Sequence, residues 1–222
     1  MIKAVVFDLD DTLFPEHQFV LSGFQAVGDW VYRKYSVPNF YLTAKQLYEQ
    51  NYRGNTFNVA LAQLNMLHNF ALIEELVSVY REHQPKLTLY ADANWAISFY
   101  AKIKKLGIIT DGYLLTQRNK VNSLGLDRII EAIVYSDEHG RDCWKPSKVP
   151  YLKFMGKLGY QGEECIYIGD NPTKDFVSAK ALGWSTVQIC RNEGEYSNIR
   201  FLDSHQADYI ITSLFELKEI II

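Results

Sequence analysis

The strongest constraint on the fold is a short apolar run at the start of the chain that ends abruptly in acid. Residues 1–7 read Met-Ile-Lys-Ala-Val-Val-Phe, and Asp8 follows them directly. A run of this length, rich in β-branched residues, is typical of a strand buried in a parallel sheet. Since ligands of such sheets bind beyond the carboxyl ends of the strands, we expect Asp8 at a functional edge.

The same pattern returns in the second half of the chain. After Pro85, short apolar runs alternate with helical segments. We expect strands at 108–110, 133–135, 165–168, 186–189 and 209–211. We expect helices at 92–106 with Gly107 as the stop, 119–124, 148–158 and 172–182. Alternation of this kind predicts an α/β domain, in which helices cover both faces of a parallel sheet.

Residues 16–85 have a different character, with no convincing strand. Val20, Phe24, Val27 and Val31 follow one another at helical spacing and mark one face of a helix that reaches residue 35. Further helices are expected at 43–52, from 56 onward, and at 69–80. We therefore predict a small helical bundle (16–85) inserted after the first strand of a core domain made of 1–15 and 86–222.

Composition excludes several function classes. The chain carries 23 Lys and Arg against 26 Asp and Glu, a net charge of -3, whereas nucleic-acid and membrane-surface binders need a basic face. No apolar run approaches the roughly 18 residues of a membrane helix, and the start lacks the features of a signal peptide. The three cysteines, Cys143, Cys165 and Cys190, are far apart and show no paired spacing, so the sequence suggests neither a zinc site nor a disulfide framework. We expect a cytoplasmic protein with neither nucleic acid nor membrane as partner.

Chemically reactive residues follow several of the expected strands. Asp8 and Asp10 follow the first strand, Thr110 ends the second and Asp111 follows it, and Asp170 follows the strand at 165–168, while Lys145 comes ten residues after Tyr135. Because the carboxyl ends of parallel strands share one edge, these carboxylates, the lysine and the hydroxyl are expected to meet in one crevice.

Clustered carboxylates repel one another and need a cation, and a site made of oxygen atoms favours Mg2+. A metal held by Asp8 and Asp170 can also hold a phosphate. Lys145 and the Thr110 hydroxyl can stabilise the charge that spreads over the phosphoryl oxygens during transfer. Asp10 projects on the same side as Asp8 in an extended chain, so one carboxylate can attack while the other moves the proton.

These residues, in this order, resemble the motifs of the haloacid dehalogenase-like hydrolase superfamily. Asp8-Leu-Asp-Asp-Thr-Leu is similar to the first motif, Thr110 to the second-motif hydroxyl, Lys145-Pro to the third-motif lysine, and the run from Gly169 to Asp175 to the fourth. The inserted bundle resembles the helical cap of the first subclass. The resemblance implies a Rossmann-like core, a phosphoaspartyl intermediate on Asp8, Asp10 as general acid/base, and acids that hold Mg2+.

Dehalogenases and phosphonatases of that superfamily lack an acid at the position of Asp10, so its presence favours phosphate esters. We therefore expect a Mg2+-dependent phosphatase that acts on a small phosphorylated metabolite such as a sugar phosphate. The expected catalytic residues are Asp8, Asp10, Thr110 and Lys145. Substrate contacts are expected from Thr110, Asp111, Lys145 and Arg53, the last in a glycine-containing loop between insertion helices. The expected metal ligands are Asp8, Asp10 (through its carbonyl), Asp170 and Asp175.

Three alternatives stay open at this stage. A phosphosugar mutase of the same superfamily would return the phosphoryl group to its substrate. A phospho-accepting signalling domain also uses acids, threonine and lysine on a parallel sheet, although it needs no inserted bundle. Asp175 has a further, purely structural interpretation as an acid that interacts with a helix N-terminus.

Overall fold

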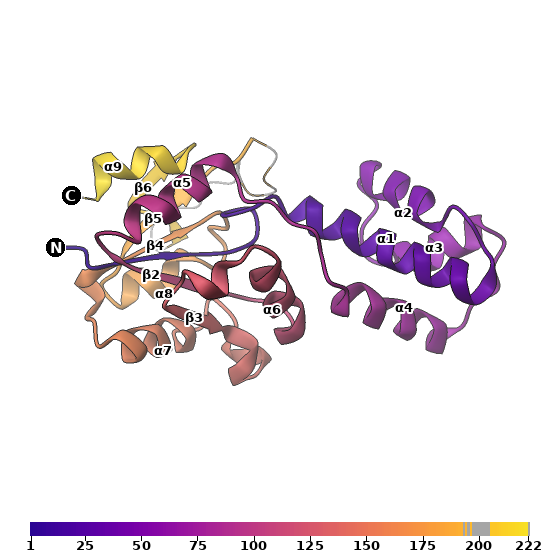
Figure 1. The fold of residues 1–222 in the computed structure, drawn as a ribbon. Coiled ribbons are helices and arrows are strands. Elements are labelled where there is room, and N and C mark those ends of the chain that lie inside the picture. The colour runs from indigo at the N-terminus through magenta and orange to yellow at the C-terminus, as the bar shows by residue number, and fades with distance from the viewer. Residues whose placement is uncertain (193, 195, 197–204, 222) are drawn as a thin grey trace. The chain divides into compact units, whose positions relative to one another are not determined.

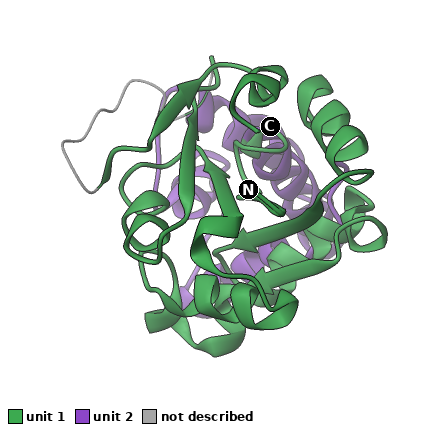
Figure 2. Cartoon of the chain, turned by 90° about the vertical axis from the view of Figure 1, so that its left-hand side faces the viewer, with its two compact units in different colours: residues 1–16, 88–222 green, residues 17–87 purple. Residues whose placement is uncertain are grey.

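The structure, a computed structural model, describes residues 1–192, 194, 196 and 205–221. The chain forms two compact units (Figure 2), one made of residues 1–16 and 88–222 and the other of residues 17–87. These divisions fall one and two residues later than the domain boundaries expected from the sequence. In the described part of the chain, no helix is long and apolar enough to cross a membrane.

The larger unit is built on a six-stranded sheet with the order β3-β2-β1-β4-β5-β6, in which all neighbouring strands are parallel. The strands are β1 (Ala4–Phe7), β2 (Lys105–Thr110), β3 (Ala132–Tyr135), β4 (Cys165–Gly169), β5 (Ser185–Ile189) and β6 (Tyr209–Ile211). Strands β1, β2 and β4 are buried along almost their whole length. The expected α/β, Rossmann-like fold is confirmed.

Helices cover both faces of this sheet (Figure 1). They are α5 (Ala91–Tyr100), α6 (Leu114–Ser123), α7 (Val149–Leu158), α8 (Phe176–Ala181) and α9 (Leu217–Ile220), with short 3-10 turns η1 (Leu126–Arg128), η2 (Ser136–His139), η3 (Arg141–Cys143), η4 (Gly162–Glu164) and η6 (Leu214–Glu216). Under α7 and α8, the rings of Tyr151, Phe154 and Trp184 pack on small and aliphatic strand residues such as Ala4 and Val6. This packing is the core that holds the sheet edge in place.

Strand register decides what meets at the carboxyl edge. Phe7 at the end of β1 is level with Ile108 of β2 on one side and Ile168 of β4 on the other. The three strands therefore end within two residues of one another. Asp8, Thr110 and Asp170 come directly after or at those ends, so the register brings them to one edge.

One predicted helix boundary is wrong for a packing reason. The helix expected at 92–106 ends at Tyr100, and Gly107 lies inside β2 rather than after a helix. A Cβ atom at Gly107 would overlap the ring of Phe154. Glycine is thus required at this position because the Phe154 ring lies close to the β2 backbone. From the sequence alone, this use of glycine cannot be told from a helix stop.

Two other helices begin elsewhere than predicted. Helix α6 begins at Leu114 rather than 119, and α8 begins at Phe176 rather than 172. In the second case the intervening residues form a turn, in which the Asn171 side chain accepts hydrogen bonds from the Thr173 N–H and hydroxyl at 2.9 and 2.6 Å. Side chains that satisfy a turn in this way compete with helix formation.

The smaller unit contains four helices, α1 (Glu16–Tyr35), α2 (Phe40–Glu49), α3 (Thr56–Gln63) and α4 (Phe70–Glu82). The α1 face expected from the sequence is buried, with Phe24, Val27 and Val31 in a core completed by the other three helices. Helix α2 begins three residues earlier than predicted, because Phe40 is also part of that core. The helical character of residues 16–85 is confirmed.

We expect Gly107→Ala to lower the free energy of unfolding by about 1–3 kcal/mol, because the added methyl group must displace the Phe154 ring from a close-packed core. Urea denaturation measures the change. The matched control is Gly156→Ala in α7, where a Cβ atom would meet nothing within 4 Å and helix propensity favours alanine. Equal effects of the two substitutions would contradict the packing role of Gly107.

Candidate active site

The first acid is positioned by the sheet itself. Asp8 follows β1 directly, is 3% exposed, and its N–H donates to the carbonyl of Ile168 in β4 at 2.8 Å. The chain then turns, and the Leu13 N–H donates to the Leu9 carbonyl at 3.0 Å. Asp11 lies in this turn with a positive φ of 49°, a conformation that glycine, asparagine and aspartate adopt most easily. The turn therefore explains a small or short polar residue after Asp10.

Lys145 supplies a buried positive charge to this edge. Its ammonium lies 2.9 Å from Asp8 Oδ1 and 2.8 Å from Asp175 Oδ1, and it donates to the Tyr167 hydroxyl at 2.8 Å. Burial alone would lower the pKa of Lys145, but Asp175 and Asp8 raise that pKa well above its ordinary value. The side chain is thus a permanent cation between two carboxylates.

Three carboxylates meet at the same place. Asp8, Asp170 and Asp175 each offer an oxygen atom, and these atoms lie within 4.8 Å of one another. Asp170 is 7% exposed, and its carboxylate has no hydrogen-bond or ion-pair partner among the described residues. A buried carboxylate without a partner is costly. These oxygen ligands fit a hard divalent cation such as Mg2+.

The electrostatics of the acids differ. Burial raises the pKa of Asp8, but Lys145 and Lys174 outweigh burial and hold that pKa below its ordinary value. Burial, together with the charges of Asp175 and Asp8, raises the pKa of Asp170 well above its ordinary value. The two lysines therefore favour the ionised form of Asp8, whereas burial and the neighbouring acids disfavour the ionised form of Asp170.

A cavity of about 250 Å³ lies over these groups. Its walls include acids and lysines from the segments that follow β1, β2, β3 and β4, namely Asp8, Asp10, Asp11, Glu16, Asp111, Lys145, Asp170 and Lys174. Lys174 was not expected from the sequence. Its ammonium lies 3.4 Å from Asp111 Oδ2, and Asp8 and Asp175 raise its pKa despite burial. The signal available in the sequence was its position inside the fourth motif.

Asp10 lies outside the three-acid group, and residues of α6 hold its carboxylate. The Lys120 ammonium lies 2.7 Å from Asp10 Oδ1, and the Gln117 amide donates to Oδ2 at 2.8 Å. Gln117 also donates to Thr110 Oγ1 at 2.5 Å. Sequence reasoning missed both residues of α6; the signal available in the sequence was their spacing of three positions, which places two polar residues on one face of a helix.

The remaining expected substrate contacts lie in different places. Asp111 Oδ1 accepts the Lys145 N–H at 3.1 Å, so Asp111 fixes the lysine loop. Arg53 belongs to the smaller unit, where its guanidinium stacks 4.0 Å above the Tyr48 ring and donates to the carbonyl oxygens of Tyr48 and Tyr52 at 2.8 and 3.1 Å. There it lines a cavity of about 300 Å³ within the helical unit. Substrate contacts by Asp111 and Arg53 stay predictions.

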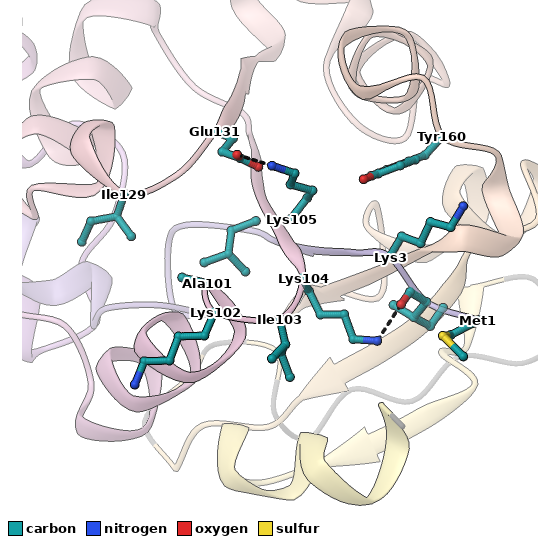
Figure 3. Close-up of a pocket in the computed structure, with 12 residues that line it drawn as sticks. Met1, Lys3, Ala101, Lys102, Ile103, Lys104, Lys105, Ile129, Glu131 and Tyr160 are labelled. Carbon is teal, nitrogen blue, oxygen red and sulfur yellow. Dashed lines mark hydrogen bonds and ion pairs between the residues drawn. The ribbon is translucent and has the colours of Figure 1, made fainter.

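Another pocket, of about 460 Å³, lies at the opposite edge of the sheet (Figure 3). Several lysines line this pocket, and three of them have an ion-pair or hydrogen-bond partner. Lys105 pairs with Glu131 at 2.5 Å, Lys3 pairs with a glutamate at 2.5 Å, and Lys104 donates to the Ile2 carbonyl at 2.7 Å. The carboxylate of Asp170, unpaired among the described residues, and the lysines Lys145 and Lys174 lie at the carboxyl edge of the sheet, so we expect the chemistry there.

Comparison with known families agrees with this geometry. The family model described as haloacid dehalogenase-like hydrolase matches residues 5–189. The chain belongs to this family. A glyceraldehyde 3-phosphate phosphatase of Methanocaldococcus jannaschii is 29% identical over 100% of this chain and 97% of its own length. A pyrophosphatase, PpaX, of Halalkalibacterium halodurans is 26% identical over 99% of this chain and 97% of its own.

Among solved structures, a HAD phosphatase from Thermococcus onnurineus is similar to this chain, with a TM-score of 0.63 and 27% identity over 99% of this chain and 97% of the other. The expected membership in the haloacid dehalogenase-like hydrolases is confirmed. The chain is thus an enzyme of this hydrolase family, whose members generally use Mg2+, and its buried acids are suited to that ion.

Asp170→Asn tests the cation site. We expect saturating Mg2+ to raise the Tm of the unmodified protein by roughly 5 °C or more, as tight binding to the folded state does. The same Mg2+ should shift the Tm of Asp170→Asn by less than about 1 °C, because the amide is a poor ligand. Thermal melts with Mg2+ and with chelator measure this, and Asp127→Asn, an exposed acid in η1, is the control. An unchanged Mg2+ response in Asp170→Asn would refute the site.

Glu16 provides a pH test of the same cavity. Burial, with the charges of Asp10 and Asp11, raises its pKa to about 7. Since the folded-state pKa lies above the ordinary one, ionisation of Glu16 lowers stability as pH rises towards and through that value. We expect Glu16→Gln to raise the free energy of unfolding by about 1–2 kcal/mol more at pH about 8.5 than at pH about 5. Urea titrations in chelator measure it, and a gain independent of pH would contradict the assignment.

Proposed function

We propose that this hydrolase is a Mg2+-dependent phosphatase that acts on a small phosphorylated metabolite in the cytoplasm. The observation that carries the proposal is the contrast between two buried acids. Asp8 is kept ionised by Lys145, while the carboxylate of the nearby Asp170 has no hydrogen-bond or ion-pair partner among the described residues. A nucleophilic carboxylate beside a cation site is what transfer of a phosphoryl group requires.

In the proposed reaction, an Asp8 oxygen attacks phosphorus and the bond between phosphorus and the ester oxygen breaks. Asp10, which enters this step protonated, gives its proton to the leaving oxygen, which departs as an alcohol. Asp10 then takes a proton from water as the water attacks phosphorus, and the bond from phosphorus to Asp8 breaks. Inorganic phosphate leaves and both acids return to their starting states.

The other residues hold charge during these steps. Lys145 neutralises Asp8 before attack and the phosphoryl oxygens after it, and the Thr110 hydroxyl donates to one of those oxygens. Asp8, Asp170 and Asp175, together with the carbonyl of Asp10, would hold Mg2+. When bound, this ion supplies Lewis-acid stabilisation of charge on the phosphoryl group.

Two findings support a small substrate. The cavity of about 250 Å³ over Asp8 suits a phosphate group with a few further atoms. The relative from Methanocaldococcus jannaschii is named for glyceraldehyde 3-phosphate, a three-carbon phosphate ester. We therefore place short-chain sugar phosphates first among the substrates to test, and inorganic pyrophosphate next. The helical unit is proposed as the cap that excludes water from the site, with Arg53 as a contact to a second anionic group.

We expect Asp8→Asn to lower Mg2+-dependent phosphate release by about 10³-fold or more, because the amide cannot form the aspartyl phosphate. Release is measured from glyceraldehyde 3-phosphate and from p-nitrophenyl phosphate, with Mg2+ and with chelator. A urea titration checks that the variant stays folded.

The control is Asp127→Asn, which should keep full activity. Retention of more than a few per cent of the activity in Asp8→Asn would overturn the mechanism. Release of an isomerised phosphate ester instead of inorganic phosphate would assign the chain to the mutases.

A further inference from the structure

Helix α6 buries polar side chains where helices usually bury apolar ones. Thr116, Gln117, Asn119 and Lys120 are all at most 7% exposed. A helix that packs on a core normally presents an apolar stripe to it, and burial of a lysine costs free energy unless its ammonium is paired. This polar face therefore needs a reason other than packing.

The contacts of the face supply that reason. Lys120 is 3% exposed, and its ammonium lies 2.7 Å from Asp10 Oδ1. The Gln117 amide nitrogen donates to Asp10 Oδ2 at 2.8 Å. The two residues are three positions apart, so their side chains emerge from one face of the helix. One rigid helix thus holds both oxygens of the Asp10 carboxylate.

Gln117 joins Asp10 to a second group of the site. Its amide nitrogen also donates to Thr110 Oγ1 at 2.5 Å. When Asp10 is ionised, its carboxylate can only accept, so the nitrogen side of the amide faces it in that state. The Thr110 oxygen then accepts from Gln117, and its own hydrogen stays available to donate to a phosphoryl oxygen.

We propose that Lys120 and Gln117 are positioning residues that hold the Asp10 carboxylate in the orientation for proton transfer to and from the ester oxygen. The proposal rests on the proposed phosphatase function. The Asp10 side chain is 22% exposed and, without these partners, would sample several rotamers. Each carboxylate oxygen has a second lone pair, so both contacts leave room for the transferred proton.

A dependence on the leaving group distinguishes this role from simple stabilisation of the fold. p-Nitrophenolate is a stable anion and leaves with little help from an acid, whereas an alkoxide needs a proton. The ratio kcat/KM reports steps up to departure of the leaving group, so it isolates the first proton transfer. A residue that orients Asp10 must therefore matter far more for an alkyl phosphate than for the aryl ester.

The experiment compares Lys120→Met with the unmodified protein on glyceraldehyde 3-phosphate, or the best alkyl phosphate found, and on p-nitrophenyl phosphate. We expect kcat/KM for the alkyl phosphate to fall by about 10²-fold, the scale of a misplaced general acid. For the aryl ester we expect a fall of less than about 10-fold. Gln117→Met should show the same preference to a smaller degree, and it is the second variant should Lys120→Met fail to fold.

Two substitutions serve as controls. Lys120→Arg keeps a donor for Asp10 and should restore most of the alkyl phosphate activity. Lys105→Met removes a lysine that pairs with Glu131 at the opposite sheet edge, and should leave both ratios unchanged. Equal losses on the two substrates in Lys120→Met and Gln117→Met would overturn the positioning role. Absence of Mg2+-dependent hydrolysis of any phosphate ester by the unmodified protein would instead overturn the proposed function.

Discussion

The site depends on one buried ammonium group. Lys145 lies between Asp8 and Asp175, at 2.9 and 2.8 Å, and none of the three side chains is more than 5% exposed. These groups come from the end of β1, the loop after β3 and the turn before α8, so the contact also joins three segments distant in sequence. Removal of one partner of a buried charge pair leaves an uncompensated charge, which costs roughly 3–5 kcal/mol. The interaction therefore determines both the local fold and the ionised state of Asp8.

This ammonium does not balance all of the negative charge. Asp170 is buried beside Asp8 and Asp175, and burial together with repulsion from these two acids raises its pKa. In a protein that needed only stability, such an acid would be replaced. Its presence is understandable if a divalent cation completes the charge balance of the site. Around this centre, α6 and the turn after β1 orient Asp10. Asp8 and Asp10 are therefore held by different partners, Asp8 by Lys145 and Asp10 by two residues of α6.

Much of the fold and site could be predicted from the sequence. Buried strands and acids at strand ends are local patterns, and the parallel sheet follows from them together with the alternation of helices. The errors have physical causes. The sequence pattern predicts a helix stop at Gly107 because glycine serves both in stops and in close packing, and only the Phe154 ring distinguishes the two. The start of α6 was missed because its buried face is polar, so it lacks the apolar periodicity that marks a helix.

By itself, the sequence determined the order of the elements. It also predicted that Asp8, Asp10, Thr110, Lys145 and Asp170 meet at one sheet edge, because residue type and strand ends are encoded locally. Only the tertiary structure decided the partners. Lys145 is shared between two acids, the Asp170 carboxylate has no partner among the described residues, and Lys120 and Gln117 hold Asp10. Distances between groups more than a hundred residues apart follow from strand register and helix packing, which no local pattern contains.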